Sequence, residues 1–431
     1  MTRSPLHPAL LGTLFLLAAG VRAARAQQDS TRAPTAVRTP PTVSIGGDGF
    51  TFRSADGHWR LRVGGYFQAD GRFYLRDAQA LGTNSLIIRR ARPIVEGTVY
   101  QYFDFRIMPD FGTGQPTIYE AYFEARLDPA LAIRAGKFKP PVGLERLQSA
   151  TDLRFVERGF PTNLVPNRDV GFQVSGEMQS GMFSYAAGVF NGVTDLGFGD
   201  VDASDAKELA ARVFTVPFVR RGRGAPLDLG VGFAGSIGNE RGTPAAPATS
   251  ALRTPGQLPA FRYRSNGASG TVVADGRRLR VEPQAYFYRG SFGLLAQYTV
   301  SRHTVRRDSS VATIRHFAWQ IAASFFLTGE RPSFRGVAPK RLFDPRAGSW
   351  GALELAARIQ ETGVADSAFP LFADPAASAR RIRAWALGLN WHFARGVKLM
   401  VDYERATFAG GAAVGNRPPE HFLATRLQTS F

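Results

Sequence analysis

Residues 59–70 read WRLRVGGYFQAD, and the side chains change character at every second position. The odd positions carry Trp, Leu, Val, Gly, Phe and Ala, whereas the even positions carry Arg, Arg, Gly, Tyr, Gln and Asp. Residues 103–110 and 118–127 alternate in the same way. A period of two, with apolar against charged residues, predicts β-strands of a sheet that has one apolar and one wet face.

Outward from this stretch, the whole chain divides into short alternating segments. Helical spacing of apolar residues is almost absent, and the 46 glycines also argue against helices. Sixteen predicted strands cover residues 58–70, 86–100, 102–110, 116–127, 131–139, 170–178, 181–190, 208–218, 226–236, 278–289, 291–302, 313–328, 349–360, 382–393, 396–407 and 420–431.

The connections between these strands alternate in length. Joins such as 100–102, 179–181 and 394–396 are tight, whereas joins such as 140–169 and 237–277 are long and polar. Short turns at one end and long loops at the other are typical of a transmembrane β-barrel. Residues 329–348 break the rule, because a join expected to be tight is about twenty residues long. That join is either an elaborated turn or a sign that the strand count is off by one hairpin.

The N-terminus predicts export. Arg3 precedes the apolar run 10–19, and Ala24-Arg25-Ala26 has the form of a cleavage site, so residues 1–26 are predicted to be a signal peptide. The run is too short for a spanning helix. Residues 27–47 are predicted to be a flexible Pro/Thr-rich leader, and residues 48–431 the barrel domain.

Soluble all-β folds fit less well. A β-sandwich needs no alternation of short and long joins, and a propeller needs a repeat that the chain lacks. A plugged transporter barrel needs about 22 strands. The amphipathic last segment ends in Phe431, the form expected for the final strand of an outer-membrane protein. The fold class is therefore predicted to be all-β, a sixteen-stranded antiparallel transmembrane β-barrel of the outer-membrane porin type.

A series of short stretches resembles the phosphate-selective porin O and P family over nearly all of residues 48–431. The matching stretches are Gly64–Asp70, Arg89–Arg92 with Glu96-Gly97, Asp104–Arg106, Ala121-Tyr122, Ala135–Pro140, Phe155–Arg158, Arg168–Gly171, Gly188–Gly192, Thr328–Glu330, Gly388–Trp391 and Asp402-Tyr403. The resemblance implies a sixteen-stranded barrel, usually a trimer, whose basic lumen conducts anions.

Net charge supports a basic lumen. The formal charge is +18, and 48 of the 53 basic residues are arginine, whose planar fork suits phosphate and carboxylate. Charge facing lipid costs roughly 2–4 kcal/mol near the midplane, so the polar parity is predicted to face the channel. The predicted lumen residues are Arg60, Arg62, Arg90, Arg92, Arg106, Arg126, Arg280 and Arg358. The alternative is that these arginines pair with acids of the same face and only hold the cross-section of the barrel.

The join 140–169 follows the fifth strand, where porins commonly fold a loop into the pore. It is predicted to form an anion-binding constriction, because clustered donors can replace the hydration shell of an anion. Its predicted residues are Lys137, Lys139, Arg146, Arg154, Arg158 and Arg168. The alternative is a loop folded outside the pore, whose charges bind one another. The phosphate site of the family uses particular lysines, and five lysines in the chain leave other anions, or no selectivity, open.

Other chemistry has little support. The chain has no cysteine, its six histidines are scattered, and no phosphate-binding glycine loop occurs, so no catalytic residue, metal site or cofactor is predicted. A lumen hydrolase around His316 or His392 is the weakest alternative. Export argues against a nucleic-acid partner.

The predicted function is a passive outer-membrane channel for small hydrophilic solutes, not an enzyme. It is expected to be integral to the outer membrane of a Gram-negative-type bacterium and to prefer inorganic anions such as phosphate. Outer-membrane lipid and two further copies of the chain, in a homotrimer, are the expected partners. The alternatives are a general porin without selectivity, and a structural or adhesive barrel that uses the loops 237–277 and 361–381.

Overall fold

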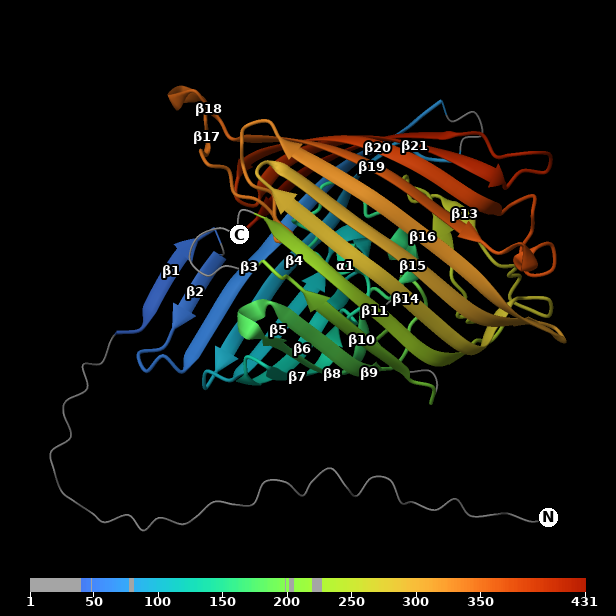
Figure 1. The fold of residues 1–431 in the computed structure, drawn as a ribbon, viewed down its shortest axis with the longest axis horizontal. Coiled ribbons are helices and arrows are strands. Elements are labelled where there is room, and N and C mark those ends of the chain that lie inside the picture. The colour runs from blue at the N-terminus through green and yellow to red at the C-terminus, as the bar shows by residue number, and fades with distance from the viewer. Residues whose placement is uncertain (1–39, 48, 77–80, 198, 201–204, 219–226) are drawn as a thin grey trace, which may run out of the picture. The chain divides into compact units, whose positions relative to one another are not determined.

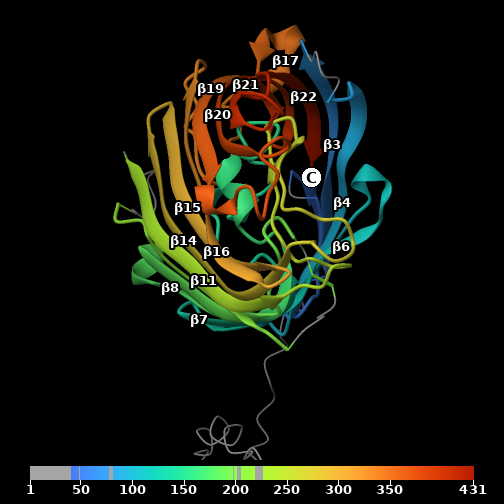
Figure 2. The ribbon, with the colours of Figure 1, turned by 90° about the vertical axis from the view of Figure 1, so that its right-hand side faces the viewer.

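The computed structural model describes residues 40–47, 49–76, 81–197, 199–200, 205–218 and 227–431. Within these residues, sixteen antiparallel strands close into a barrel, in agreement with the predicted fold class (Figures 1 and 2). The barrel strands are β3 (Trp59–Leu75), β4 (Ser85–Val99), β5 (Phe103–Asp110), β6 (Thr117–Asp128), β7 (Leu131–Phe138), β8 (Asp169–Met178), β9 (Phe183–Phe190), β10 (Glu208–Thr215), β11 (Asp228–Arg241), β14 (Val273–Arg289), β15 (Phe292–Arg307), β16 (Ser310–Phe326), β19 (Ala352–Val364), β20 (Ala379–Ala394), β21 (Val397–Gly410) and β22 (Glu420–Ser430). Each strand pairs with the next, and β22 returns to β3 through ten residue pairs from His421↔Leu75 to Ser430↔Tyr66.

The two faces of the wall differ as the sequence period predicts. On β21, for example, Met400, Asp402 and Glu404 are buried, whereas Leu399 and Val401 on the other parity are partly exposed. Apolar side chains thus cover the outside, and polar ones fill the inside. None of the helices among the described residues is long and apolar enough to cross a membrane.

The N-terminal part of the described chain departs from the predicted leader. Residues 42–46 form the strand β1 (Thr42–Gly46), which pairs with β2 (Gly49–Arg53), and β2 pairs with the start of β3. Alternation in 42–46 is too short to stand out from the Pro/Thr-rich context. The predicted signal peptide and residues 27–39 lie outside the described residues.

One end of the barrel carries tight turns. Tyr100 and Gln101 both have positive φ in the three-residue turn 100–102, which joins the paired residues Val99 and Phe103. Gly396 has φ of 83° in the β20–β21 turn, where only glycine is unstrained. The long join between β16 and β19 lies at this end too, and it contains a small hairpin of β17 (Phe343–Asp344) and β18 (Ser349–Trp350) around the 3-10 turn η4 (Pro345–Ala347). It is an elaborated turn, and the strand count is correct.

The other end carries long loops, with one exception. The β15–β16 join is only Asp308-Ser309, because both strands continue beyond their predicted ends at residues 302 and 313. Their added residues include Arg306 and Arg307, which lack the apolar parity used to find strands. The β11–β14 loop contains the short strands β12 (Leu252–Arg253) and β13 (Pro259–Phe261), which pair with each other.

The loop between β7 and β8 folds into the barrel. Its turns are α1 (Leu144–Leu147) and the 3-10 helix η2 (Phe160–Leu164), and Leu144 and Leu164 have no exposed surface. Phe160 and Leu164 share an apolar cluster with Phe261 and Val305. Figure 2 shows such coiled and looped segments inside the ring of strands. Three further 3-10 turns lie in connections between strands. They are η1 (Gly112–Gly114) between β5 and β6, η3 (Gln179–Gly181) between β8 and β9, and η5 (Asp366–Ala368) after β19.

Candidate functional site

Three cavities follow one another through the barrel, each sharing residues with the next. The first, of about 440 Å³, opens at the tight-turn end beside Gly396 and Phe431. The second, of about 410 Å³, shares Tyr66, Arg106 and Ser149 with the first. The third, of about 100 Å³, shares Ala150 and Arg168 with the second and extends to the β11–β14 loop at the long-loop end. We call them the lower, middle and arginine cavities.

Basic side chains dominate the lining of the two inner cavities. In the middle cavity, Glu120 is the one acid among five cations, which are Arg106, Arg134, Lys139, Arg168 and Arg212. In the arginine cavity, Glu157 is the one acid among seven arginines, which are Arg89, Arg90, Arg92, Arg146, Arg158, Arg168 and Arg253. Such an excess of fixed positive charge in a confined space raises the local concentration of anions.

Three of the predicted constriction residues hold neutral acceptors rather than carboxylates. Lys139 donates to the carbonyls of Leu147 and Gln148, both at 3.0 Å. Arg158 donates to the carbonyls of Glu145 (3.0 Å) and Gln148 (2.9 Å).

Arg146 is the third predicted constriction residue that donates to neutral acceptors. It donates to Asn167 Oδ1 at 3.2 Å and to the Thr162 carbonyl at 3.0 Å. Its Nε is buried without a hydrogen-bond partner among the described residues, as is Nε of Arg168. Unused buried N–H donors are costly, so they favour an acceptor inside the cavity.

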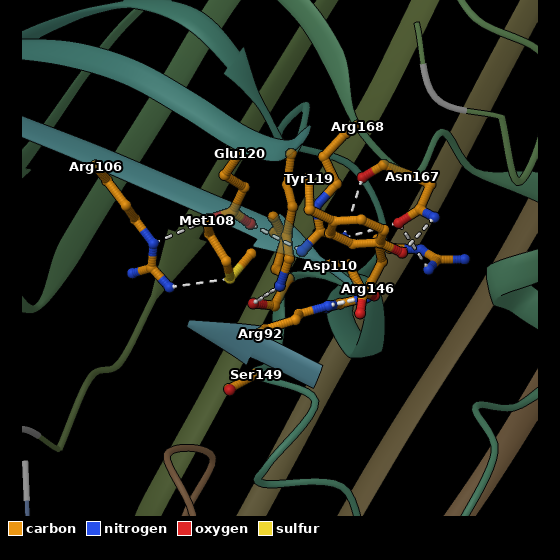
Figure 3. A network of polar contacts seen from close by, with 12 residues as sticks. Arg92, Arg106, Met108, Asp110, Tyr119, Glu120, Arg146, Ser149, Asn167 and Arg168 are labelled. Carbon is orange, nitrogen blue, oxygen red and sulfur yellow. Dashed lines mark hydrogen bonds and ion pairs between the residues drawn. The ribbon is translucent and has the colours of Figure 1, made fainter. Parts of the chain in front are cut away.

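Arg168 ties the loop to the wall. It pairs with Glu120 at 2.8 Å and donates to Asn167 Oδ1 at 2.7 Å. The Tyr119 ring lies between two guanidinium groups, with Arg92 at 3.6 Å and Arg168 at 4.3 Å from its centroid. Figure 3 shows this network, in which Arg92, Arg146 and Arg168 surround Tyr119.

Burial, together with neighbouring cations, lowers the pKa of three basic side chains in this cluster. Burial, followed by the charges of Arg168 and Arg158, lowers the pKa of Lys139 well below its usual range. Burial and the charge of Arg158 lower the pKa of Arg146 to about 9. Burial also lowers the pKa of Arg158 to about 10, although Glu145 opposes the shift. Because Lys139, Arg146 and Arg158 donate to neutral acceptors and form no ion pair among the described residues, an anion beside them would stabilise the cluster.

Glu157 anchors the loop on the barrel wall at β3 and β4. It accepts Arg72 and Arg89, each at 2.7 Å, and these two arginines come from β3 and β4. Despite burial, the charges of Arg89 and Arg72 hold the pKa of Glu157 far below its usual range. Glu157 is thus a permanent negative charge that fixes the loop and neutralises part of the arginine cavity.

The other predicted constriction residues lie elsewhere. Arg154 lines the lower cavity, where it donates to Ser324 Oγ at 2.9 Å and lies 3.5 Å from Glu354. Lys137 is the penultimate residue of β7 and pairs with Asp200 of the β9–β10 loop. Lys137 is not among the residues that line the three cavities, so its predicted place in the constriction does not match the geometry.

Most of the predicted lumen arginines are ion-paired. Their partners are Glu96 for Arg62, Asp110 for Arg92, Glu96 and Glu120 for Arg106, Asp104 for Arg126, Asp195 and Glu208 for Arg280, and Glu404 for Arg358. Arg90 is buried and donates to Gln68 Oε1 at 2.7 Å. Arg60 lies at the exposed start of β3. For most of the wall, the alternative of arginines paired across the lumen therefore describes the geometry.

Sequence reasoning missed Arg89 and Arg253 of the arginine cavity. Arg89 lies beside a register shift in the β3–β4 pairing, between Gln68 and Ala69, which breaks the parity that assigns faces. Arg253 lies on the β11–β14 loop, where no parity exists. The alternation in 118–127 predicts Tyr119 on the apolar face of its strand, whereas its side chain lines the arginine cavity with its ring beside Arg92 and Arg168.

Nothing in the described residues favours a metal or a hydrolytic site. No group of three or more His, Asp or Glu side chains there lies close enough to hold a metal ion. His392 lies 3.2 Å from Glu354, and His316 accepts or donates at 2.6 Å with the Tyr263 hydroxyl. These contacts satisfy buried polar groups of the wall.

Comparison with known proteins now adds to the geometry. The model of the family described as phosphate-selective porin O and P matches residues 61–431. The chain belongs to this family. A search of curated protein sequences finds no relative of significant similarity. This porin is thus an outer-membrane β-barrel channel, and by the usual architecture its tight-turn end faces the periplasm.

Solved structures support the same fold. The outer-membrane channel DcaP of Acinetobacter baumannii matches with a TM-score of 0.56 at 11% identity, over 88% of this chain and 99% of that chain. An anion-selective porin from Comamonas acidovorans matches with a TM-score of 0.52 at 11% identity, over 86% and 100%. OmpT of Vibrio cholerae, folded in vitro, matches with a TM-score of 0.52 at 12% identity, over 87% and 98%.

Proposed function

We propose that this porin passes small inorganic anions in preference to cations, with phosphate as an accepted anion, through the lower, middle and arginine cavities. The observation that carries the proposal is the arginine cavity, where seven arginines face one glutamate. Donors in such a constriction exchange the hydration shell of an anion for N–H contacts. Family membership and the anion-selective porin of similar fold support the same direction.

The balance of positive and negative charge in the lumen distinguishes an anion-preferring channel from a general porin. The paired arginines of the wall add little net field, because each lies beside a carboxylate. Arg90, Arg146, Arg158 and Lys139 hold only neutral acceptors among the described residues. Preference for anions therefore rests on the inward loop and the wall facing it, not on the lumen as a whole.

The remaining parts of the proposal concern how the porin reaches its place and assembles. Residues 1–26 act as a signal peptide, and the chain is integral to the outer membrane of a Gram-negative-type bacterium. Three copies form a homotrimer. The inorganic anion and the surrounding lipid are its partners, and it uses no cofactor.

Planar-bilayer recordings of the purified porin under a KCl gradient test the proposal. We expect a reversal potential displaced toward the chloride equilibrium potential and a chloride current that phosphate reduces in a saturable way. A reversal potential near zero would assign the protein to the general porins. Absence of conductance would favour a structural or adhesive barrel.

A further inference from the structure

A row of arginines lies on the outside of the barrel, facing away from the lumen. These arginines belong to the outward face of the wall, which is otherwise apolar and consists of the odd positions of β14, β16, β20 and β21 and the even positions of β15. On four strands, an outward aromatic residue near the periplasmic end and an outward arginine lie ten positions apart. The pairs are Phe287 and Arg277, Phe292 and Arg302, Phe325 and Arg315, and Trp391 and Arg381.

Ten residues match the height of the membrane. With a rise of about 3.3 Å per residue and a tilt of about 40°, ten residues rise about 25 Å along the barrel axis, which is the height of the apolar band of such barrels. The arginines therefore lie at the extracellular boundary of the band. Tyr298, Trp319, Trp385 and Tyr403 lie on the same face just inside it, where amphipathic rings prefer the headgroup level.

The arginines are brought close together. Arg302 and Arg315 are direct partners in the β15–β16 register, an arrangement in which like charges repel. The guanidinium groups of Arg315 and Arg381 both approach the Phe317 ring, at 5.7 and 5.9 Å from its centroid. A counter-charge bound outside the wall would relieve this repulsion.

The wall supplies little counter-charge. Glu361 accepts Arg381 at 3.3 Å and Arg383 at 2.9 Å. Arg315 donates to the Tyr298 hydroxyl at 2.9 Å. Among the described residues, no carboxylate forms an ion pair with Arg302, Arg315 or Arg405. The lipid patch, as we define it by Arg302, Arg315, Arg381, Arg383 and Arg405, has five cations and one acid.

The patch is confined to one flank. On β3, β4 and β6, outside the patch, the outward residues near the long-loop ends are Leu75, Leu86 and Ile118, which are apolar and exposed. A general requirement for positive charge at the membrane boundary would act on all strands alike. The confinement instead indicates a binding site on β15–β21.

We propose that the lipid patch binds the phosphate groups of an anionic lipid of the outer leaflet. Arginine forms bidentate, charge-assisted hydrogen bonds to phosphate, and clusters of basic residues at a membrane boundary attract anionic headgroups. The phosphate lies between Arg302, Arg315 and Arg381. The acyl chains run down the outer wall over Phe317, Trp319 and Ile321, where the exposed surface is apolar. This site is independent of anion passage, because its side chains face away from the lumen.

The test compares lipid binding to the porin purified from outer membranes in a neutral detergent. The probe is bisphosphorylated lipid A, and native mass spectrometry counts the lipids bound. We expect the R302Q/R315Q variant to lose affinity at least tenfold. The matched control, R289Q/R346Q, removes two exposed arginines at the periplasmic end and should bind as the wild type does. Phosphatidylcholine and inorganic phosphate should not compete.

Several other outcomes of this test would contradict the proposal. Equal binding by R302Q/R315Q and its control, or no lipid on the wild type, would overturn the proposal. Competition by inorganic phosphate would show that the patch binds the free ion. A changed oligomeric state of the variant with unchanged lipid binding would show that the patch is a contact between copies of the chain. Either result would also overturn the proposal. Should R302Q/R315Q fail to fold, R383Q/R405Q at the other end of the patch gives the same comparison, with bilayer conductance as the check on folding.

Discussion

Replacing Arg146 and Arg158 by glutamine will raise the phosphate concentration needed for half-block of chloride current by about 100-fold. Hydrogen bonds from charged groups contribute roughly 1.5–3 kcal/mol each, and about 1.4 kcal/mol is a factor of ten in affinity. Glutamine keeps a donor for the carbonyls that these arginines hold at 2.9–3.2 Å. The change therefore removes two charges from the arginine cavity while the loop retains its fold.

The matched control for this variant is Arg126→Gln. Arg126 is half-exposed near the periplasmic end and pairs with Asp104, so its removal should change half-block less than twofold. Half-block is measured in planar bilayers by titration of phosphate into chloride. Equal shifts in R146Q/R158Q and R126Q would show that phosphate senses the overall charge and not the arginine cavity.

Breaking the pair that joins the first and last barrel strands will cost about 3–5 kcal/mol in free energy of unfolding. Arg426 of β22 binds Asp70 of β3 through two hydrogen bonds of 2.7 Å, and neither side chain has exposed surface. Arg426→Met leaves the Asp70 carboxylate buried without its partner. Because Asp70 and Arg426 lie on the first and last barrel strands, the loss weakens the contact that closes the barrel.

Urea unfolding of the porin refolded into lipid vesicles measures this effect. Two comparisons make it specific. Arg126→Met breaks a half-exposed pair and should cost less than about 1 kcal/mol. The double variant D70N/R426Q, which carries neither charge of this pair, should recover most of the loss. An Arg426→Met barrel as stable as the wild type would mean that water reaches Asp70 and solvates it.

The alternation of apolar and polar residues in the sequence predicts most of the fold. A strand whose faces meet lipid and water has to alternate, so β3, β5 and β6 stand out in the sequence by their parity alone. The same rule fails where a strand leaves the membrane, because both faces then meet water. For this reason β15 and β16 extend past their predicted ends at residues 302 and 313, and the sequence pattern leaves Arg306 and Arg307 in a loop. The β1–β2 hairpin was missed because five residues of weak alternation do not stand out.

The residues of the candidate site were likewise predicted where a sequence pattern exists and missed where none does. Parity placed Arg90 and Arg92 in the lumen, and the position of the loop after the fifth strand suggested Lys139, Arg146, Arg158 and Arg168 together. Pairing between particular side chains has no period, so the ion pairs of Arg280 and Arg358 could not be assigned from the sequence. Lys137 is predicted in the constriction because it precedes the inward loop. Its actual partner, Asp200, lies on a loop far along the chain, and the sequence pattern does not indicate that contact.

The central claim is that an oxyanion occupies the arginine cavity on its way through the channel. The most direct test is anomalous diffraction from crystals of the porin soaked in selenate, a tetrahedral oxyanion whose selenium is visible at its absorption edge. The account predicts an anomalous peak bounded by Arg146, Arg158 and Arg168, and no such peak in R146Q/R158Q. Selenate only on the outer surface of the barrel, with an empty lumen in the wild type, would contradict it.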